Sequence, residues 1–251
     1  MSLSLPVWWQ PLAMTAWTGG LAVAAVLAYA ARRRYTALLP LAAATAAAML
    51  VAQTGDAMWR DDPLFERQVC DTSLRPNICV NALYRGLLPK VSAALSDVTG
   101  RLEGVENLPV RFEDLPGEPK PDEAQLPMLT PLGWYVVRGE LINPQQYAWE
   151  AAAALTGKAV QCEARGNDER AHRVDNTVTD WLSPNPGRDD LDERFEEQAR
   201  TRGDEKELAR IKADKNALVH LTSMGDDGRR DWLTGYFATA DSCDPSKVPA
   251  L

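Results

Sequence analysis

Histidine and acidic side chains are the residues of this chain that could act in acid–base catalysis. The 251-residue sequence has two histidines, His172 and His220, and neither belongs to an H-E-x-x-H motif. Carboxylate pairs such as Glu196-Glu197 alternate with arginine and lysine, which is typical of a solvated helix face with ion pairs one turn apart. The GxxxxGK[ST], GxGxxG and GxSxG motifs are absent. We therefore expect no catalytic residue and no cofactor site.

Cysteine and histidine are also the side chains best suited to bind a transition metal. The four cysteines, Cys70, Cys79, Cys162 and Cys243, form no C-x-x-C pair and have no histidine near them in sequence. We expect no metal site. The formal net charge of -8 also argues against nucleic acid as a partner.

Two uncharged stretches, residues 12–31 and 35–54, are the elements that must position everything that follows. Each is about 20 residues long, which lets an α-helix cross roughly 30 Å of hydrocarbon. Buried helices of a soluble core are the alternative, but such helices are usually shorter and have a polar face. A cleaved signal peptide is disfavoured because no Lys or Arg precedes the first stretch. The sequence predicts a two-helix transmembrane hairpin within residues 1–55.

The basic loop between the two stretches predicts how the hairpin is oriented. Arg32, Arg33 and Arg34 carry all the positive charge before Arg60, and short basic loops stay in the cytoplasm. The chain would then be a multi-pass cell-membrane protein with both termini on the outer side of the membrane. Residues 56–251 would form an extracytoplasmic domain.

All four cysteines fall in the part assigned to the outside. An even number of cysteines in an oxidising compartment indicates two disulfides, although four cysteines allow three pairings. We favour Cys70–Cys79, which closes a short loop containing the turn-forming Pro76-Asn77 pair, and Cys162–Cys243.

Small residues mark one face of the first apolar stretch. Gly20, Ala24 and Ala28 follow one another at four-residue spacing, a pattern that lets two helix backbones approach closely. This face could pack on the second helix of the hairpin. It could also dock with transmembrane helices of other proteins, which would fit the membrane part of a larger assembly.

The remaining sequence predicts a mainly helical α+β domain. Apolar residues have helical spacing from 84 to 102, with a break at Pro89, and short strands are expected at 110–112 and 134–137 on either side of a loop at 115–131. Further helices are expected at 144–157, 168–182 and 191–224, with a division at Gly203, and Asp226 is expected to cap the last helix.

One local pattern resembles a known family. Residues 79–89 read Cys-Val-Asn-Ala-Leu-Tyr-Arg-Gly-Leu-Leu-Pro, and Tyr84 and Arg85 fall in a segment similar to one in actinobacterial polytopic membrane proteins associated with ABC-type transport. That family has a Cys-Val-His-Pro-x-Tyr-Arg-like stretch just outside the membrane. Asn81-Ala82 replaces the His-Pro pair here, so no role of that histidine carries over.

A second match lies near the C-terminus, where residues 221–224 and 229–233 are similar to the last helix of the same family. The resemblance implies membrane lipid, an integral-membrane permease and a separate ATPase as partners. The expected function is a non-enzymatic subunit or accessory component of an ABC-type export complex. The alternatives are a freestanding envelope sensor or immunity-like binding protein and, less favoured, a degenerate peptidase-like domain without its zinc motif.

Overall fold

The computed structural model divides the chain into two compact units, Met1–Phe65 and Glu66–Leu251. It describes residues 4–6, 10–30, 38–54, 59–61, 67–114, 119–120, 122–129, 135–156, 163–185 and 187–251. The boundary between the units lies later than the expected end at residue 55. The reason is that strand β1 (Ser4–Pro6) pairs antiparallel with β2 (Trp59–Asp61) and so joins both ends of the first unit.

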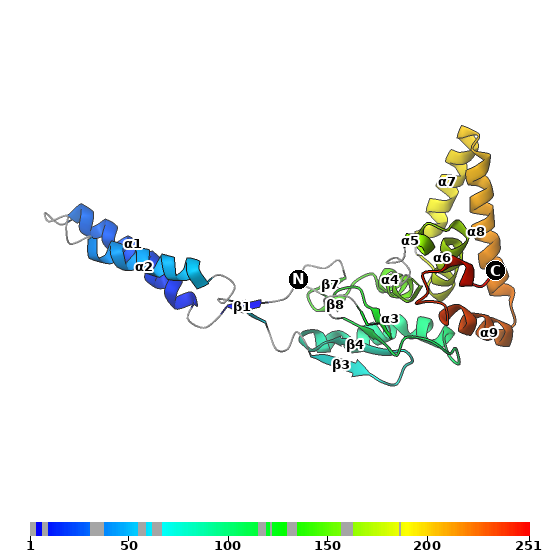
Figure 1. Ribbon diagram of the computed structural model, residues 1–251, viewed down its shortest axis with the longest axis horizontal. Helices are drawn as coiled ribbons and strands as arrows, with labels where there is room; N and C mark the ends of the chain where they lie inside the picture. The colour runs from blue at the N-terminus through cyan, green and yellow to red at the C-terminus, as the bar shows by residue number, and fades with distance from the viewer. Residues whose placement is uncertain are drawn as a thin grey trace. The chain divides into compact units, whose positions relative to one another are not determined.

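The first unit is a helical hairpin in which α1 (Gln10–Ala30) packs along α2 (Leu38–Thr54) (Figure 1). Gly20 and Ala24 lie on the face that meets α2. A Cβ atom placed on Gly20 would lie 3.1 Å from the Cβ of Ala44, and Ala24 is buried. Ala28 is exposed. The close helix contact is therefore made inside the hairpin, and docking of this face with other helices stays a prediction.

In the part of the chain that the structure describes, one helix is long and apolar enough to span a membrane. This segment, Pro11–Tyr29, has 19 residues and is almost entirely unburied. As described, α2 has 17 residues. One candidate membrane helix near the N-terminus is therefore supported. The second predicted span stays a prediction, and the basic loop Arg32–Arg34 lies outside the described residues.

The second unit is mainly helical and contains one four-stranded sheet (Figure 1). The sheet has the order β3-β4-β5-β6, antiparallel between β3 and β4 and parallel from β4 to β6. Its strands are β3 (Gln68–Asp71), β4 (Asn77–Asn81), β5 (Arg111–Glu113) and β6 (Glu123–Gln125), and a separate hairpin consists of β7 (Val136–Val137) and β8 (Glu140–Leu141). The helices are η3 (Ala82–Leu87), α3 (Leu88–Arg101), α4 (Pro144–Thr156), α5 (Glu163–Gly166), α6 (Glu169–Leu182), α7 (Arg188–Arg202), α8 (Glu205–Ser223), α9 (Asp226–Phe237) and η5 (Pro245–Lys247).

Several predicted helix boundaries are confirmed because single residues fix them. Pro89 lies in the first turn of α3, where its missing N–H is not needed. Asp168 caps α6, and its side chain accepts a hydrogen bond from Ala171 N at 2.8 Å. Gly203, with φ of 67°, ends α7 in the left-handed conformation before α8 begins.

Other expectations at this level were wrong. Strand β6 lies inside the segment expected to be a loop at 115–131. The expected strand at 134–137 is reduced to Val136–Val137, and Trp134 lies outside the described residues. The cap of α9 is Gly225 rather than Asp226, whose carboxylate instead pairs with Arg229 one turn later.

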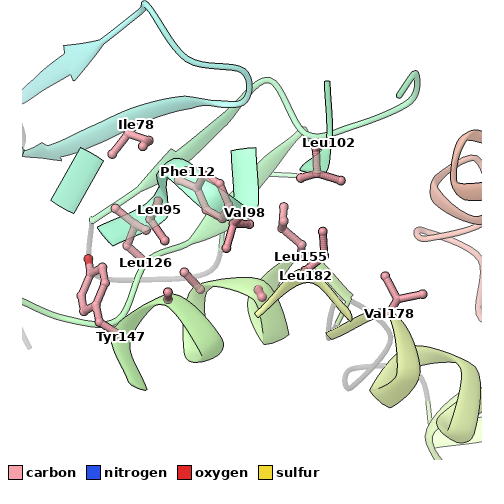
Figure 2. Close-up of a cluster of buried hydrophobic side chains, with 14 of the residues drawn as sticks. Ile78, Leu95, Val98, Leu102, Phe112, Leu126, Tyr147, Leu155, Val178 and Leu182 are labelled. Carbon is pink, nitrogen blue, oxygen red and sulfur yellow. The ribbon is translucent and has the colours of Figure 1, made fainter. Parts of the chain in front are cut away.

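The hydrophobic core of the second unit lies between the sheet and helices α3, α4 and α6 (Figure 2). Ile78 and Phe112 from the sheet, Leu95 from α3 and Leu155 from α4 are each completely buried. Burying such a side chain stabilises a fold by about 1.5–3 kcal/mol relative to leaving it exposed. The core thereby fixes α3 and α4 on the strands that carry the groups described below.

The predicted Cys70–Cys79 disulfide is confirmed, with an S–S distance of 2.04 Å. The two cysteines are direct cross-strand partners of β3 and β4. The bond therefore locks the register of the antiparallel pair at the edge of the sheet.

The other predicted disulfide involves Cys162, which lies outside the described residues. Arg165, three positions after Cys162, has its Nη1 atom 3.4 Å from the carbonyl oxygen of Ser242, the residue before Cys243. We expect non-reducing peptide mapping to return a Cys162–Cys243 peptide as the second cross-link. A Cys70–Cys162 or Cys79–Cys243 peptide as the major species would contradict this pairing.

Candidate functional site

A groove of about 410 Å³ lies between α6, α8 and the last residues of the chain. Arg170, Arg173, Asn216 and His220 supply its polar lining, and Leu251 part of its apolar lining. His220 is exposed, and among the described residues its ring makes no hydrogen bond or ion pair.

The two arginines of the groove are held by other groups. Arg173 Nε lies 2.9 Å from Asp214 Oδ1 and its Nη2 lies 3.1 Å from Glu169 Oε1. Arg170 Nη1 donates to the carbonyl oxygen of Val248 at 2.8 Å, so it fastens the C-terminal segment to α6. The groove can accept hydrogen-bonding groups of a ligand, but it does not bring a nucleophile and a base together.

Metal binding has no geometric support in the part of the chain that the structure describes. No three His, Cys, Asp or Glu side chains gather there in a way that could hold an ion. Several carboxylates of α7 and α8 pair along or between the helices, as in Glu196 with Lys215 at 2.7 Å and Arg210 with Asp214 at 3.1 Å. These pairs match the solvated helix faces predicted from the sequence.

A buried ion pair joins α5, α6 and α9. The Arg165 side chain is 0% exposed, and its Nη2 lies 2.7 Å from Asp175 Oδ1. The hydroxyl of Tyr236 donates to the same carboxylate at 2.7 Å. Arg165 Nη1 also donates to the carbonyl oxygen of Thr239 at 2.7 Å. The network holds the end of the chain against α6 and is structural in character.

A second buried polar group lies at the carboxyl end of the parallel strands. Asp114 follows β5 directly and is 6% exposed. Backbone N–H groups of Asn81 and Leu129 bind its carboxylate, while Oδ2 has no hydrogen-bond partner among the described residues. The hydroxyl of Tyr147 on α4 is likewise buried and without a partner. Ligands of α/β sheets often bind at this end of the strands, so this cluster is a second candidate site.

Burial perturbs the titration of this cluster. It raises the pKa of Asp114 to about 6, although the two backbone N–H groups act in the opposite direction. Burial, reinforced by the charge of Asp114, also raises the pKa of Tyr84 and holds that of Tyr147 well above the ordinary value. Perturbed carboxyl groups of this kind are common at functional sites.

A neighbouring acidic pair lies on β5 and β6. Burial first, and then the nearby Glu123, raises the pKa of Glu113. Burial also acts to raise the pKa of Glu123, but hydrogen bonds from Lys120, Glu113 and Arg111 outweigh it and lower this pKa to about 2. Strands β5 and β6 are thus held together by the buried carboxylate of Glu123, which Arg111 partly neutralises.

The residues that carry the family resemblance lie in η3. Tyr84 packs partly buried against the core, and Arg85 is exposed. Neither borders the groove. The charge of Asp114, a neighbour that the sequence does not reveal, contributes to the raised pKa of Tyr84. Asp114 lies in a stretch that reads as an ordinary acidic loop, and the signal available was its position directly after a strand of alternating residues.

Comparison with known proteins returned nothing: no family model, no curated protein and no solved structure matches this chain.

Proposed function

We propose that this chain is a non-enzymatic, membrane-anchored binding protein. The observation that carries the proposal is the apolar surface of α1. Its large side chains point outward, with Leu12 62% and Val26 63% exposed. Such a surface is costly in water and favourable in lipid. The second unit, by contrast, exposes charged helices suited to an aqueous compartment.

The non-enzymatic character is supported by the two candidate sites. Among the residues that the structure describes, the ring of His220 in the groove makes no hydrogen bond or ion pair with a carboxylate. The carboxyl group with the strongly raised pKa, Asp114, does not line the groove. A general base must reach the proton it abstracts, and these groups do not share a cavity in the described part of the chain.

The more specific proposal is an accessory subunit of an ABC-type export complex, with a permease and a separate ATPase as partners. It rests on the resemblance around Tyr84 and Arg85. The exposed position of Arg85 leaves it accessible to a partner. The outer domain would bind that partner or a substrate outside the membrane.

Cysteine labelling in intact cells tests the anchored topology. We expect Gly100→Cys to react with an impermeant maleimide from outside, because residue 100 is exposed on α3. Arg33→Cys should react only after the membrane is opened. Labelling of position 33 in intact cells would reject the orientation, and release of the chain by carbonate extraction would reject the anchor.

Gentle purification from the native membrane then tests the partner class. Co-purification of a permease and an ATPase would support the export complex. Recovery of the chain alone, with correct topology, would favour a freestanding envelope sensor or immunity-like binder instead.

A further inference from the structure

The surroundings of Asp114 stabilise the ionised form of its carboxyl group poorly. Its backbone N–H continues the parallel pairing by donating to the carbonyl oxygen of Cys79 at 3.1 Å, which fixes the residue at the end of β5. One carboxylate oxygen is bound by backbone N–H groups, and Oδ2 has no partner. A buried carboxylate oxygen without a donor destabilises the charged form.

The groups that face Asp114 come from every element packed around it. Asn81 at the end of β4 and Leu129 after β6 contribute backbone N–H groups. The titratable neighbours are Tyr84 from η3 and Tyr147 from α4. No lysine, arginine or second carboxylate of the described residues acts on it, so no cation there compensates its charge.

The hydroxyl of Tyr147 makes the position more unusual. Tyr147 is 0% exposed, and its ring packs edge-on against Tyr135 with the centroids 5.3 Å apart. Figure 2 shows the ring rising from α4 toward the sheet side of the core. A buried hydroxyl without a partner and a buried carboxylate oxygen without a partner thus lie in one region of the core. Natural proteins leave few such atoms unpaired.

We propose that Asp114 is a proton-binding site through which the pH around the outer domain sets the stability of its packing. Protonation removes the uncompensated charge and allows the carboxyl group to donate a hydrogen bond. Ionisation places a negative charge between the sheet and α4 and weakens their packing. The ligand of this site is a proton, and the tyrosines stay protonated throughout.

The direction of the effect follows from the raised pKa of Asp114, which is about 6 when folded against 3.8 as the ordinary value. Between these pH values the folded state binds more protons than the unfolded state. The stability contributed by protonation is therefore complete below about pH 4 and is lost as the pH rises to about 6. A mildly acidic medium should therefore raise the free energy of unfolding of the outer domain.

A direct titration tests the site in the intact protein. The full chain is labelled with ¹³C-carboxyl aspartate, held in detergent micelles, and followed by NMR from pH 3 to 8, with Asp114→Asn used to assign the resonance. We expect a midpoint near pH 6 for Asp114. A midpoint at or below about pH 4 would overturn the proposal.

Unfolding in urea supplies the second test. The ratio of the unfolding equilibrium constants of the wild type and Asp114→Asn should rise about 50-fold between pH 4 and pH 7, which is most of the change expected from a pKa difference of about two units. Asp190→Asn removes an exposed carboxylate on α7, and its ratio should stay near one. A flat ratio for Asp114→Asn would refute the proton site.

Discussion

Replacing Arg165 with methionine is expected to lower the free energy of unfolding of the outer domain by about 3–5 kcal/mol. The substitution keeps much of the side-chain volume but removes the guanidinium that neutralises Asp175 at 2.7 Å. Asp175 would then keep a hydrogen bond from Tyr236 but no cation. The carbonyl oxygens of Thr239 and Ser242 would also lose the hydrogen bonds from Arg165, and Thr239 would keep the one from the Ser242 N–H at 3.0 Å. Leaving a buried charge uncompensated is among the most destabilising effects that a point mutation can have.

The effect can be measured by urea unfolding of the full chain, followed by tryptophan fluorescence. Arg173→Met is the matched control, because Arg173 is also ion-paired, with two carboxylates, but its side chain is 25% exposed. For a partly exposed ion pair we expect a loss of about 1 kcal/mol or less. Equal losses for the two variants would mean that the Arg165 network contributes no more than an ordinary surface pair.

Sequence reasoning located the helices of the outer domain well because their ends depend on local chemistry. Proline at the start of α3, aspartate before α6 and glycine between α7 and α8 each act within one turn of backbone. The Cys70–Cys79 disulfide could be predicted equally well, because a turn-forming residue pair lies between the two cysteines. These features need no knowledge of the rest of the fold.

Features that depend on distant parts of the chain could not be predicted in this way. Strand β6 has the sequence Glu-Ala-Gln, which favours no strand, and it forms because β5 offers it an edge for pairing. Arg165 reads as a surface residue, yet Asp175, Tyr236 and the C-terminal segment enclose it. The charge partners of a buried residue are set by tertiary packing.

Replacing Gly20 with leucine is expected to force α1 and α2 apart. Even a Cβ atom at this position would lie 3.1 Å from the Cβ of Ala44 and 3.3 Å from the carbonyl oxygen of Pro40. The second of these atoms belongs to the backbone and cannot turn aside. Overpacking of this kind typically destabilises a contact by about 1–3 kcal/mol. In lipid no hydrophobic driving force between helices would offset that loss.

Gly19 provides an adjacent control, because a Cβ atom placed there would meet nothing within 4 Å. Gly19→Leu should leave the hairpin intact, and both variants should remain in the membrane fraction, since leucine favours the bilayer more than glycine does. Spin labels on Leu12→Cys and Met49→Cys, both exposed positions, report the helix separation by double electron–electron resonance. We expect a broadened and longer distance for Gly20→Leu and the wild-type distance for Gly19→Leu.

If both variants keep the wild-type distance, the small-residue face is not what holds the hairpin together. If Gly20→Leu keeps that distance but loses the partners found with the wild type, the same face docks with other helices, and the accessory-subunit proposal gains its physical basis.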